Sequence, residues 1–201
     1  MGEPLYALVR QFWEQEEIKP MVEQITPEER ECEDLFVRSH SRSREGRYTV
    51  RLPVASSLPD FATTRYAAAR MMSQMERCFA QDARLENLYK TFMRKYEELG
   101  HMSRVSESGS EGRICYLPHH GVLPEASTIT KLRVVFNGSL VTASGDTLNK
   151  NLLTGRNLLP PLIDILLRWR WHRFVFTADI EKMYRQILVH PANGDLQRII
   201  W

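Results

Sequence analysis

The spacing of apolar residues predicts a series of helices along the first half of the chain. Apolar side chains recur every three to four positions, and Pro20 ends the first such segment. Thr26 followed by proline and two glutamates is a typical helix start, and Gly100 is a typical helix stop. The expected helices cover residues 5–18, 26–37, 62–80 and 82–99.

Alternation of apolar and polar side chains predicts strands, most of them in the second half. Tyr48, Val50 and Leu52 alternate with polar residues until Pro53 closes the segment. The expected strands cover residues 47–53, 113–118, 121–124, 131–139 and 173–178, the expected loops 39–46, 103–112 and 142–157, and a further helix 158–171. Helices packed on short, partly antiparallel strands define an α+β class.

Composition narrows the class of protein only slightly. The chain has 201 residues, 43% of them hydrophobic and 26% charged, which is typical of a globular domain. A net charge of +2 is too small to indicate a nucleic-acid partner by itself. Cys32, Cys78 and Cys115 are far apart and odd in number, which favours a reducing compartment over a disulfide framework. Neither a membrane-spanning apolar run nor a signal peptide is expected.

Asp179 is the first candidate for chemistry, because it follows the apolar run 174–176 after only two residues. A carboxylate at the end of a buried strand is rigidly placed, and Mg²⁺ prefers such hard oxygen ligands. The alternative is that Asp179 caps the short turn 180–185. Spacing alone favours capping.

Lys131 and Arg133 form a second candidate site on the expected strand 131–136. Alternation places both cations on one face, with Leu132 and Val134 on the other. Two neighbouring cations suit a triphosphate, and arginine can bind phosphate with two parallel hydrogen bonds. The alternative is an ordinary solvated strand face.

Three further polar groups have simpler interpretations. Basic and aromatic residues alternate over 168–173, which suits a nucleic-acid backbone but equally the end of an amphipathic helix. The basic segment 39–47 is a plausible phosphate contact and more often a solvated loop. His119 and His120 would point to opposite faces of a strand, which favours a structural role over a shared metal.

The order of several segments resembles a known family. "TKLRVVFNGS", "LLTGRNLLPPLIDILLRWR" and "FTADIEKMYRQI" resemble the fingers and the start of the palm of a retroelement reverse transcriptase. More narrowly, they resemble the Pao/BEL group of LTR retrotransposons. "FWEQEEI", "GRYTVRLP" and "YLPHHGVL" resemble the region that links protease to polymerase in that group's polyprotein, so the resemblance spans nearly the whole chain.

This resemblance implies roles for particular residues in RNA-directed DNA synthesis. Asp179 and the backbone carbonyl of Ile180 would bind Mg²⁺ in a two-metal site, and Tyr184 would exclude a ribose 2′-hydroxyl. Gln186 would support that aromatic gate. The basic residues Lys131 and Arg133 would hold the nucleotide triphosphate. Asn137 stands where the family usually has an aspartate, which puts an ion pair between fingers and palm in doubt.

The resemblance also implies an organisation and a set of partners. Residues 1–45 would be a helical linker region, 46–112 a strand plus two helices connecting to the polymerase, and 113–201 the fingers and first palm strand. The partners would be an RNA template, a DNA primer and a deoxynucleotide, with protease, RNase H and integrase elsewhere in the polyprotein. A cytoplasmic location, free or within virus-like particles, would follow, with no membrane contact.

The family's Tyr-x-Asp-Asp motif is absent, and the only aspartate after Asp179 is Asp195, in a turn. One carboxylate cannot assemble a two-metal site, so the chain alone is expected to be inactive. Residues 196–201 are expected to begin an apolar strand with nothing to cover it, which would make Trp201 a truncation point. The alternatives are a non-enzymatic remnant that binds nucleic acid or a protein, and a helical interaction module in residues 1–100.

Overall fold

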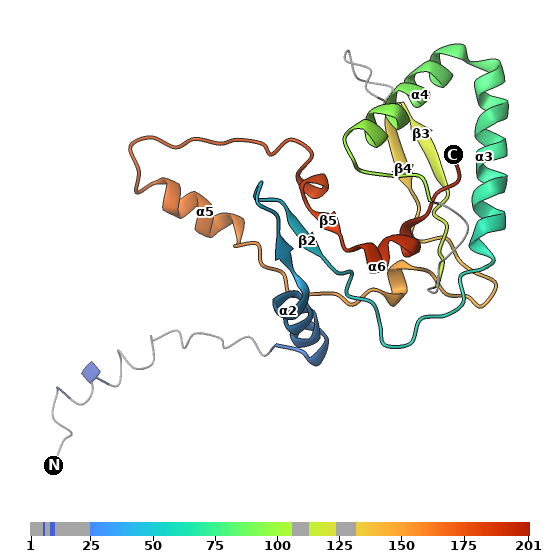
Figure 1. Cartoon of the computed structure of the whole chain (residues 1–201). Coiled ribbons are helices and arrows are strands. Elements are labelled where there is room, and N and C mark those ends of the chain that lie inside the picture. Colours follow the sequence, from blue (N-terminus) through green and yellow to red (C-terminus); the bar gives the residue numbers. More distant parts are fainter. Residues whose placement is uncertain (1–5, 7–8, 11–24, 106–112, 124–131) are drawn as a thin grey trace.

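A computed structural model describes residues 6, 9–10, 25–105, 113–123 and 132–201 (Figure 1). The helix expected over residues 5–18 and the loop expected over 103–112 lie largely outside these residues. The described elements mix helices with two small sheets, which confirms the α+β class. In chain order the elements that follow are α2, β1, β2, α3, α4, β3, β4, η1, α5, η2, β5, α6 and η3.

Helix α2, Pro27–Ser39, begins as the sequence predicts. The Thr26 hydroxyl accepts a hydrogen bond from the Glu29 amide at 3.2 Å. The Thr26 amide donates in return to the Glu29 carboxylate at 2.8 Å. This reciprocal pair satisfies two amides that the first helical turn leaves without partners, so the local sequence alone sets the start of the helix.

Helices α3, Thr64–Gln81, and α4, Ala83–Glu98, pack on each other beside the two-stranded sheet described next (Figure 1). Asp82 separates them, and its carboxylate accepts from the Leu85 amide at 2.9 Å. Gly100 follows α4 with φ of +67°, a conformation that glycine adopts without steric cost. Both predicted helices are therefore confirmed, with their expected cap and stop.

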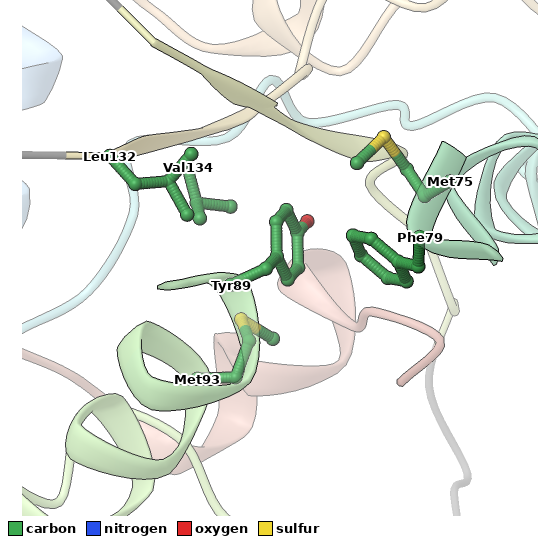
Figure 2. Close-up of a cluster of buried hydrophobic side chains, with 6 residues drawn as sticks. All are labelled: Met75, Phe79, Tyr89, Met93, Leu132 and Val134. Atoms are coloured by element: carbon green, nitrogen blue, oxygen red, sulfur yellow. The ribbon is translucent and has the colours of Figure 1, made fainter. Parts of the chain in front are cut away.

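The main core lies between these helices and the sheet of β3, His119–Val122, and β4, Arg133–Phe136. Figure 2 shows Met75, Phe79, Met93, Leu132 and Val134 converging on the ring of Tyr89. Tyr89 and Met93 are 0% exposed. Leu132, just before β4, and Val134 within it face this core while Arg133 is exposed, so the predicted alternation is confirmed.

His119 has the structural role that the sequence suggested. Its side chain is buried, and its Nδ1 accepts a hydrogen bond from the Tyr89 hydroxyl. Its Nε2–H donates to the Ile200 carbonyl at 2.9 Å. Both ring nitrogens are therefore used by a neutral imidazole. Burial lowers the pKa of His119, the bond to Ile200 opposes that shift, and His120 adds to it.

The lowered pKa predicts that acid destabilises the fold. Because its pKa is lowered, His119 binds a proton less readily in the folded chain than in the unfolded chain. Its full contribution to folding stability is therefore present above pH 6.5, the ordinary pKa of histidine. It should be lost progressively as pH falls below that value. His101, whose pKa burial also lowers, contributes in the same direction. Urea midpoints measured from pH 7.5 down to about pH 5 should fall, and His119→Gln should flatten the curve. An unchanged slope in that variant would contradict the assignment to His119.

The other sheet joins segments far apart in the chain. Strand β1, Ser41–Arg42, pairs antiparallel with β2, Tyr48–Val50, and β2 pairs in parallel with β5, Leu188–Val189. The prediction that residues 39–46 are only a loop is therefore wrong at β1. Two polar residues carry no alternation signal, and only their hydrogen bonds to β2 make them a strand.

The strand predicted over residues 113–118 is also wrong. Only Tyr116 forms a bridge, with Arg198, while β3 starts two residues earlier than the strand predicted over 121–124. The Leu117 amide donates to the Arg198 carbonyl at 2.7 Å, and the Arg198 amide donates to the Cys115 carbonyl at 3.0 Å. These bonds hold Arg198 against residues 115–117. Residues 196–201 form no strand, and of them Gln197 and Trp201 are exposed, so the expected apolar strand with nothing to cover it is wrong as well. Leu196 is buried, and the Trp201 ring lies 5.4 Å from the Tyr89 ring.

The turn-rich segment 142–157 is confirmed and contains only the short helix η1, Asn149–Asn151. Beyond it the chain leaves the core, forms α5, Leu162–Trp169, and returns through η2, Met183–Gln186, to β5 (Figure 1). Helix α5 is shorter than predicted because it starts after Pro160 and Pro161. The chain then ends with the short helices α6, Pro191–Gly194, and η3, Asp195–Gln197.

The strand predicted over residues 173–178 is wrong in this structure. Residue 173 is a bend, residues 174–178 have no regular secondary structure, and Phe176 is 91% exposed. A strand needs a neighbour to complete its hydrogen bonds, and in the described part of the chain none is paired with this segment. The apolar run that suggested a buried palm strand therefore faces solvent.

Candidate nucleic-acid interface

Arg47 links the hairpin of β1 and β2 to the short helix η2. Its Nε–H donates to the Gln186 carbonyl at 3.2 Å, and its Nη2 donates to the Arg185 carbonyl at 2.6 Å. The parallel pairing of β2 with β5 brings these segments together, because β5 directly follows η2. A single guanidinium therefore fixes where η2 ends and β5 begins.

Arg185 in turn covers an aromatic cluster at the end of α4. Its guanidinium carbon lies 4.8 Å from the centroid of the Tyr96 ring and 5.5 Å from that of Phe92. The Tyr96 ring also packs against Phe136 of β4, at 5.7 Å between centroids. Cations over ring faces are attracted by the negative face of the π-system, so this contact holds Arg185 in place.

His101 lies near the same cations. Burial lowers the pKa of His101, and the positive charges of Arg185, Arg47 and Lys182 lower it further. The His101 Nε2 is buried without a hydrogen-bond partner among the described residues, and the imidazole lies beside Tyr96 at 5.2 Å. We call Arg47, Lys182 and Arg185 the basic junction. Lys182 is also paired with Glu181 at 2.9 Å, which partly neutralises it.

The hairpin extends this positive surface. Arg42 donates to the Gly46 carbonyl at 3.0 Å and lies over the Tyr48 ring at 5.1 Å, while Arg44 is exposed near the turn. Gly46 has φ of +89°, which closes the turn. Cations interleaved with aromatic rings, on a surface built from two distant segments, suit a phosphate backbone with neighbouring bases.

The residues expected to bind metal and nucleotide are exposed on the segment leading to this junction. Asp179 is exposed, as is Ile180, and the Tyr184 side chain is 85% exposed. The exposed Gln186 donates from Nε2 to the Glu181 carbonyl at 3.0 Å, which closes the turn. The cap of η2 is Lys182 rather than Asp179, so the capping interpretation of Asp179 does not apply to that helix.

The donor set for Mg²⁺ does not fit the two-metal site that the resemblance implies. The described residues include no cluster of three or more histidine, cysteine, aspartate or glutamate side chains able to hold a metal. Asp179 and the Ile180 carbonyl supply one carboxylate and one neutral oxygen, and two clamped cations require more. No catalytic step is therefore derived through magnesium in this chain.

The fingers candidates are only partly described. Arg133 is exposed at the start of β4, and Lys131 lies outside the described residues. Asn137 has a local role: its side-chain oxygen accepts from the Ser139 amide at 2.9 Å, and its amide donates to the Pro118 carbonyl at 2.8 Å. The structure gives no contact that joins Arg133 to Asp179 or Tyr184, so it does not bring these predicted site residues together.

A cavity of about 310 Å³ lies elsewhere, between α3, α4 and the C-terminal residue. It holds none of the predicted site residues, and its Lys90 is paired with Glu86 at 2.6 Å. Its lining is Met72, Glu76, Phe79, Ala80, Glu86, Lys90 and Trp201.

The sequence interpretation missed the basic junction. Arg47 was assigned to a strand and to the basic segment 39–47, and Arg185 had no role, because the contact between them depends on a pairing of distant strands. The sequence offered only one indication of this junction: polar segments beside β2 and β5 each contain an arginine, Arg47 and Arg185.

Comparison with known proteins adds no identity. No protein family, no curated protein and no solved structure matches the chain. Within the described ranges, no helix has both the length and the apolar character needed to cross a bilayer.

Proposed function

We propose that this chain is part of an RNA-directed DNA polymerase of the Pao/BEL retrotransposon type, and that its basic junction contacts the phosphate backbone of the template and primer. The hydrogen bonds that join Arg47 to the Arg185 and Gln186 carbonyls, with Arg185 over the Tyr96 ring, carry the proposal for binding. The order of sequence segments from 130 to 187 supports the proposal for the polymerase. Asp179, Ile180 and Tyr184 would then lie on the segment that enters the junction from α5.

The proposed contact is electrostatic and therefore depends on salt. An RNA–DNA hybrid should bind the 201-residue chain, and its association constant should fall linearly with salt concentration on a logarithmic scale. Arg44→Ala and Lys182→Ala should each reduce the slope by about 1, because each removes one phosphate contact. Fluorescence anisotropy of a labelled hybrid measures both quantities, with poly-glutamate as a polyanion that lacks bases.

The results would separate binding from catalysis. An affinity that is absent, independent of salt or equal for poly-glutamate would contradict the proposed interface. Primer extension with Mg²⁺ should show no incorporation by this chain, because one carboxylate cannot hold two cations. A transcript that reads past the Trp201 codon into Tyr-x-Asp-Asp would support the polymerase as parent.

A second candidate function rests on the lone carboxylate. Since the described residues supply no metal cluster, the chain can equally be a retroelement-derived remnant that binds nucleic acid without catalysis. Hybrid binding together with a stop codon after Trp201 in the transcript would favour this remnant. Binding of a deoxynucleotide through Arg133 and Tyr184, measured by calorimetry with and without Mg²⁺, would favour the polymerase.

A further inference from the structure

A long apolar surface lies on the segment that leaves the core. We call residues 158–176 the apolar arm, and Figure 1 shows its helix α5 projecting away from the α3–α4 core. Trp171 is 86% exposed, although tryptophan is usually well covered in folded proteins. A contiguous exposed apolar surface beyond several hundred Å² indicates an interaction site. The exposed large apolar residues of the arm are Leu158, Leu159, Leu162, Ile163, Leu166, Leu167, Trp169, Trp171, Phe174, Val175 and Phe176.

The arm is also positively charged. Asp164 is its only acidic residue, whereas Arg168, Arg170 and Arg173 are basic, which gives a net charge of +2. All three arginines are exposed, and Arg173 lies over the neighbouring Phe174 ring at 5.3 Å. A partner for this surface therefore needs apolar side chains flanked by acidic ones.

Helix α2 has that chemistry. It buries none of its residues, and Phe36 and Val37 are exposed. It carries five acidic and two basic side chains, a net charge of −3. Burial and then Glu31, Glu28, Glu29 and Glu33 raise the pKa of the Cys32 thiol, in keeping with the negative charge of the helix. The apolar arm is therefore positively charged, and the exposed surface of α2 is negatively charged.

Both surfaces lie close enough to serve one symmetric interface. A Cβ placed on Gly155, just before the arm, would lie 3.6 Å from the Cys32 Cβ, so the arm starts beside α2. In a two-fold symmetric dimer, the arm of the first copy can contact α2 of the second while the arm of the second contacts α2 of the first. The same contact therefore forms twice. The 13 residues of α2 span about 20 Å, which is long enough to accommodate the eight residues of α5.

We propose that two copies of this chain form a symmetric dimer in which the apolar arm of each copy packs against α2 of the other. Arg168 of one copy faces Glu33 of the second, which shares a face of α2 with Phe36 and Val37, while the leucine and tryptophan side chains of the arm cover these two residues. The proposal does not depend on nucleic-acid binding, because the basic junction lies outside both surfaces.

Sedimentation velocity over a wide range of protein concentration tests the dimer. The wild-type chain should shift from monomer to dimer as concentration rises, and high salt should weaken the association. Two reversal variants, Glu33→Lys and Arg168→Glu, should each weaken it by about tenfold or more, because each contact forms twice in the dimer. Reversing Arg77 and Arg94 to glutamate, on α3 and α4, is the matched control and should leave it unchanged.

Mixing the two reversal variants gives the sharpest test. In a mixed pair, a like-charge contact is avoided because the Glu33→Lys helix of one copy meets the Arg168→Glu arm of the other, and the second contact is the wild-type one. Dimers should therefore reappear in the mixture, and also in a single chain that carries both reversals. A wild-type chain that stays monomeric, reversals without effect, or a mixture that fails to associate would each overturn the proposal.

Discussion

Replacing Tyr89 by alanine is expected to lower the free energy of unfolding by about 3–5 kcal/mol. The side chain is 0% exposed, and its ring lies 5.2 Å from the Phe79 ring and 5.4 Å from the Trp201 ring. Removing it leaves a cavity that rigid neighbours from α3, β4 and the C-terminus cannot fill. It also removes the hydroxyl that donates to the buried Nδ1 of His119. Urea denaturation followed by circular dichroism measures the loss.

Two controls divide this loss into packing and polar contributions. Tyr89→Phe keeps the ring but leaves His119 Nδ1 without its donor, so it should cost about 1–3 kcal/mol. Tyr66→Ala removes the same side chain from an exposed face of α3 and should change stability by less than about 0.5 kcal/mol. If the alanine variants at 89 and 66 unfold at the same urea concentration, the main core is not where the structure places it.

Replacing Arg47 by alanine is expected to loosen η2 and β5 together and to weaken nucleic-acid binding. Two hydrogen bonds from the guanidinium to the Arg185 and Gln186 carbonyls are lost. Because this site is partly open to water, the expected loss of stability is about 1–2 kcal/mol. Hydrogen exchange should show reduced protection of amides 185–189, and hybrid affinity should fall.

Arg47→Lys separates geometry from charge. Lysine keeps the positive charge but cannot donate two bonds from a planar fork, so stability should fall while the salt dependence of binding is largely retained. Arg44→Ala is the reverse control, since it removes a hairpin charge without touching η2. Equal stability of the alanine and wild-type proteins at position 47 would show that the junction does not depend on this arginine.

The sequence was enough to predict an element correctly wherever the residues of one segment form the hydrogen bonds among themselves. Thr26 with Glu29, and Asp82 with Leu85, set helix starts from side chains a few residues apart. The alternation of Leu132 and Val134 gave the buried face of β4, because that period belongs to the strand itself.

The predictions failed where the outcome depends on distant residues. The run 174–176 reads as a buried strand, yet it is exposed because no described strand pairs with it. Residues 113–118 form one bridge instead of a strand because the C-terminal residues lie against them. The basic junction was missed for the same reason, since Arg47 and its acceptor Gln186 are 139 residues apart. The proposed roles of Asp179 and Tyr184 remain predictions.

The long stretch of sequence between β2 and β5 affects the order in which the chain folds during synthesis. Strand β2 emerges from the ribosome long before β5, so its edge has no parallel partner until residues 188–189 have been made. The α3–α4 pair, by contrast, forms from neighbouring residues. Contacts between distant residues form slowly because their loops must close first. The β1–β2 hairpin is therefore expected to remain an open edge, accessible to other nascent chains, while residues 51–187 are being made.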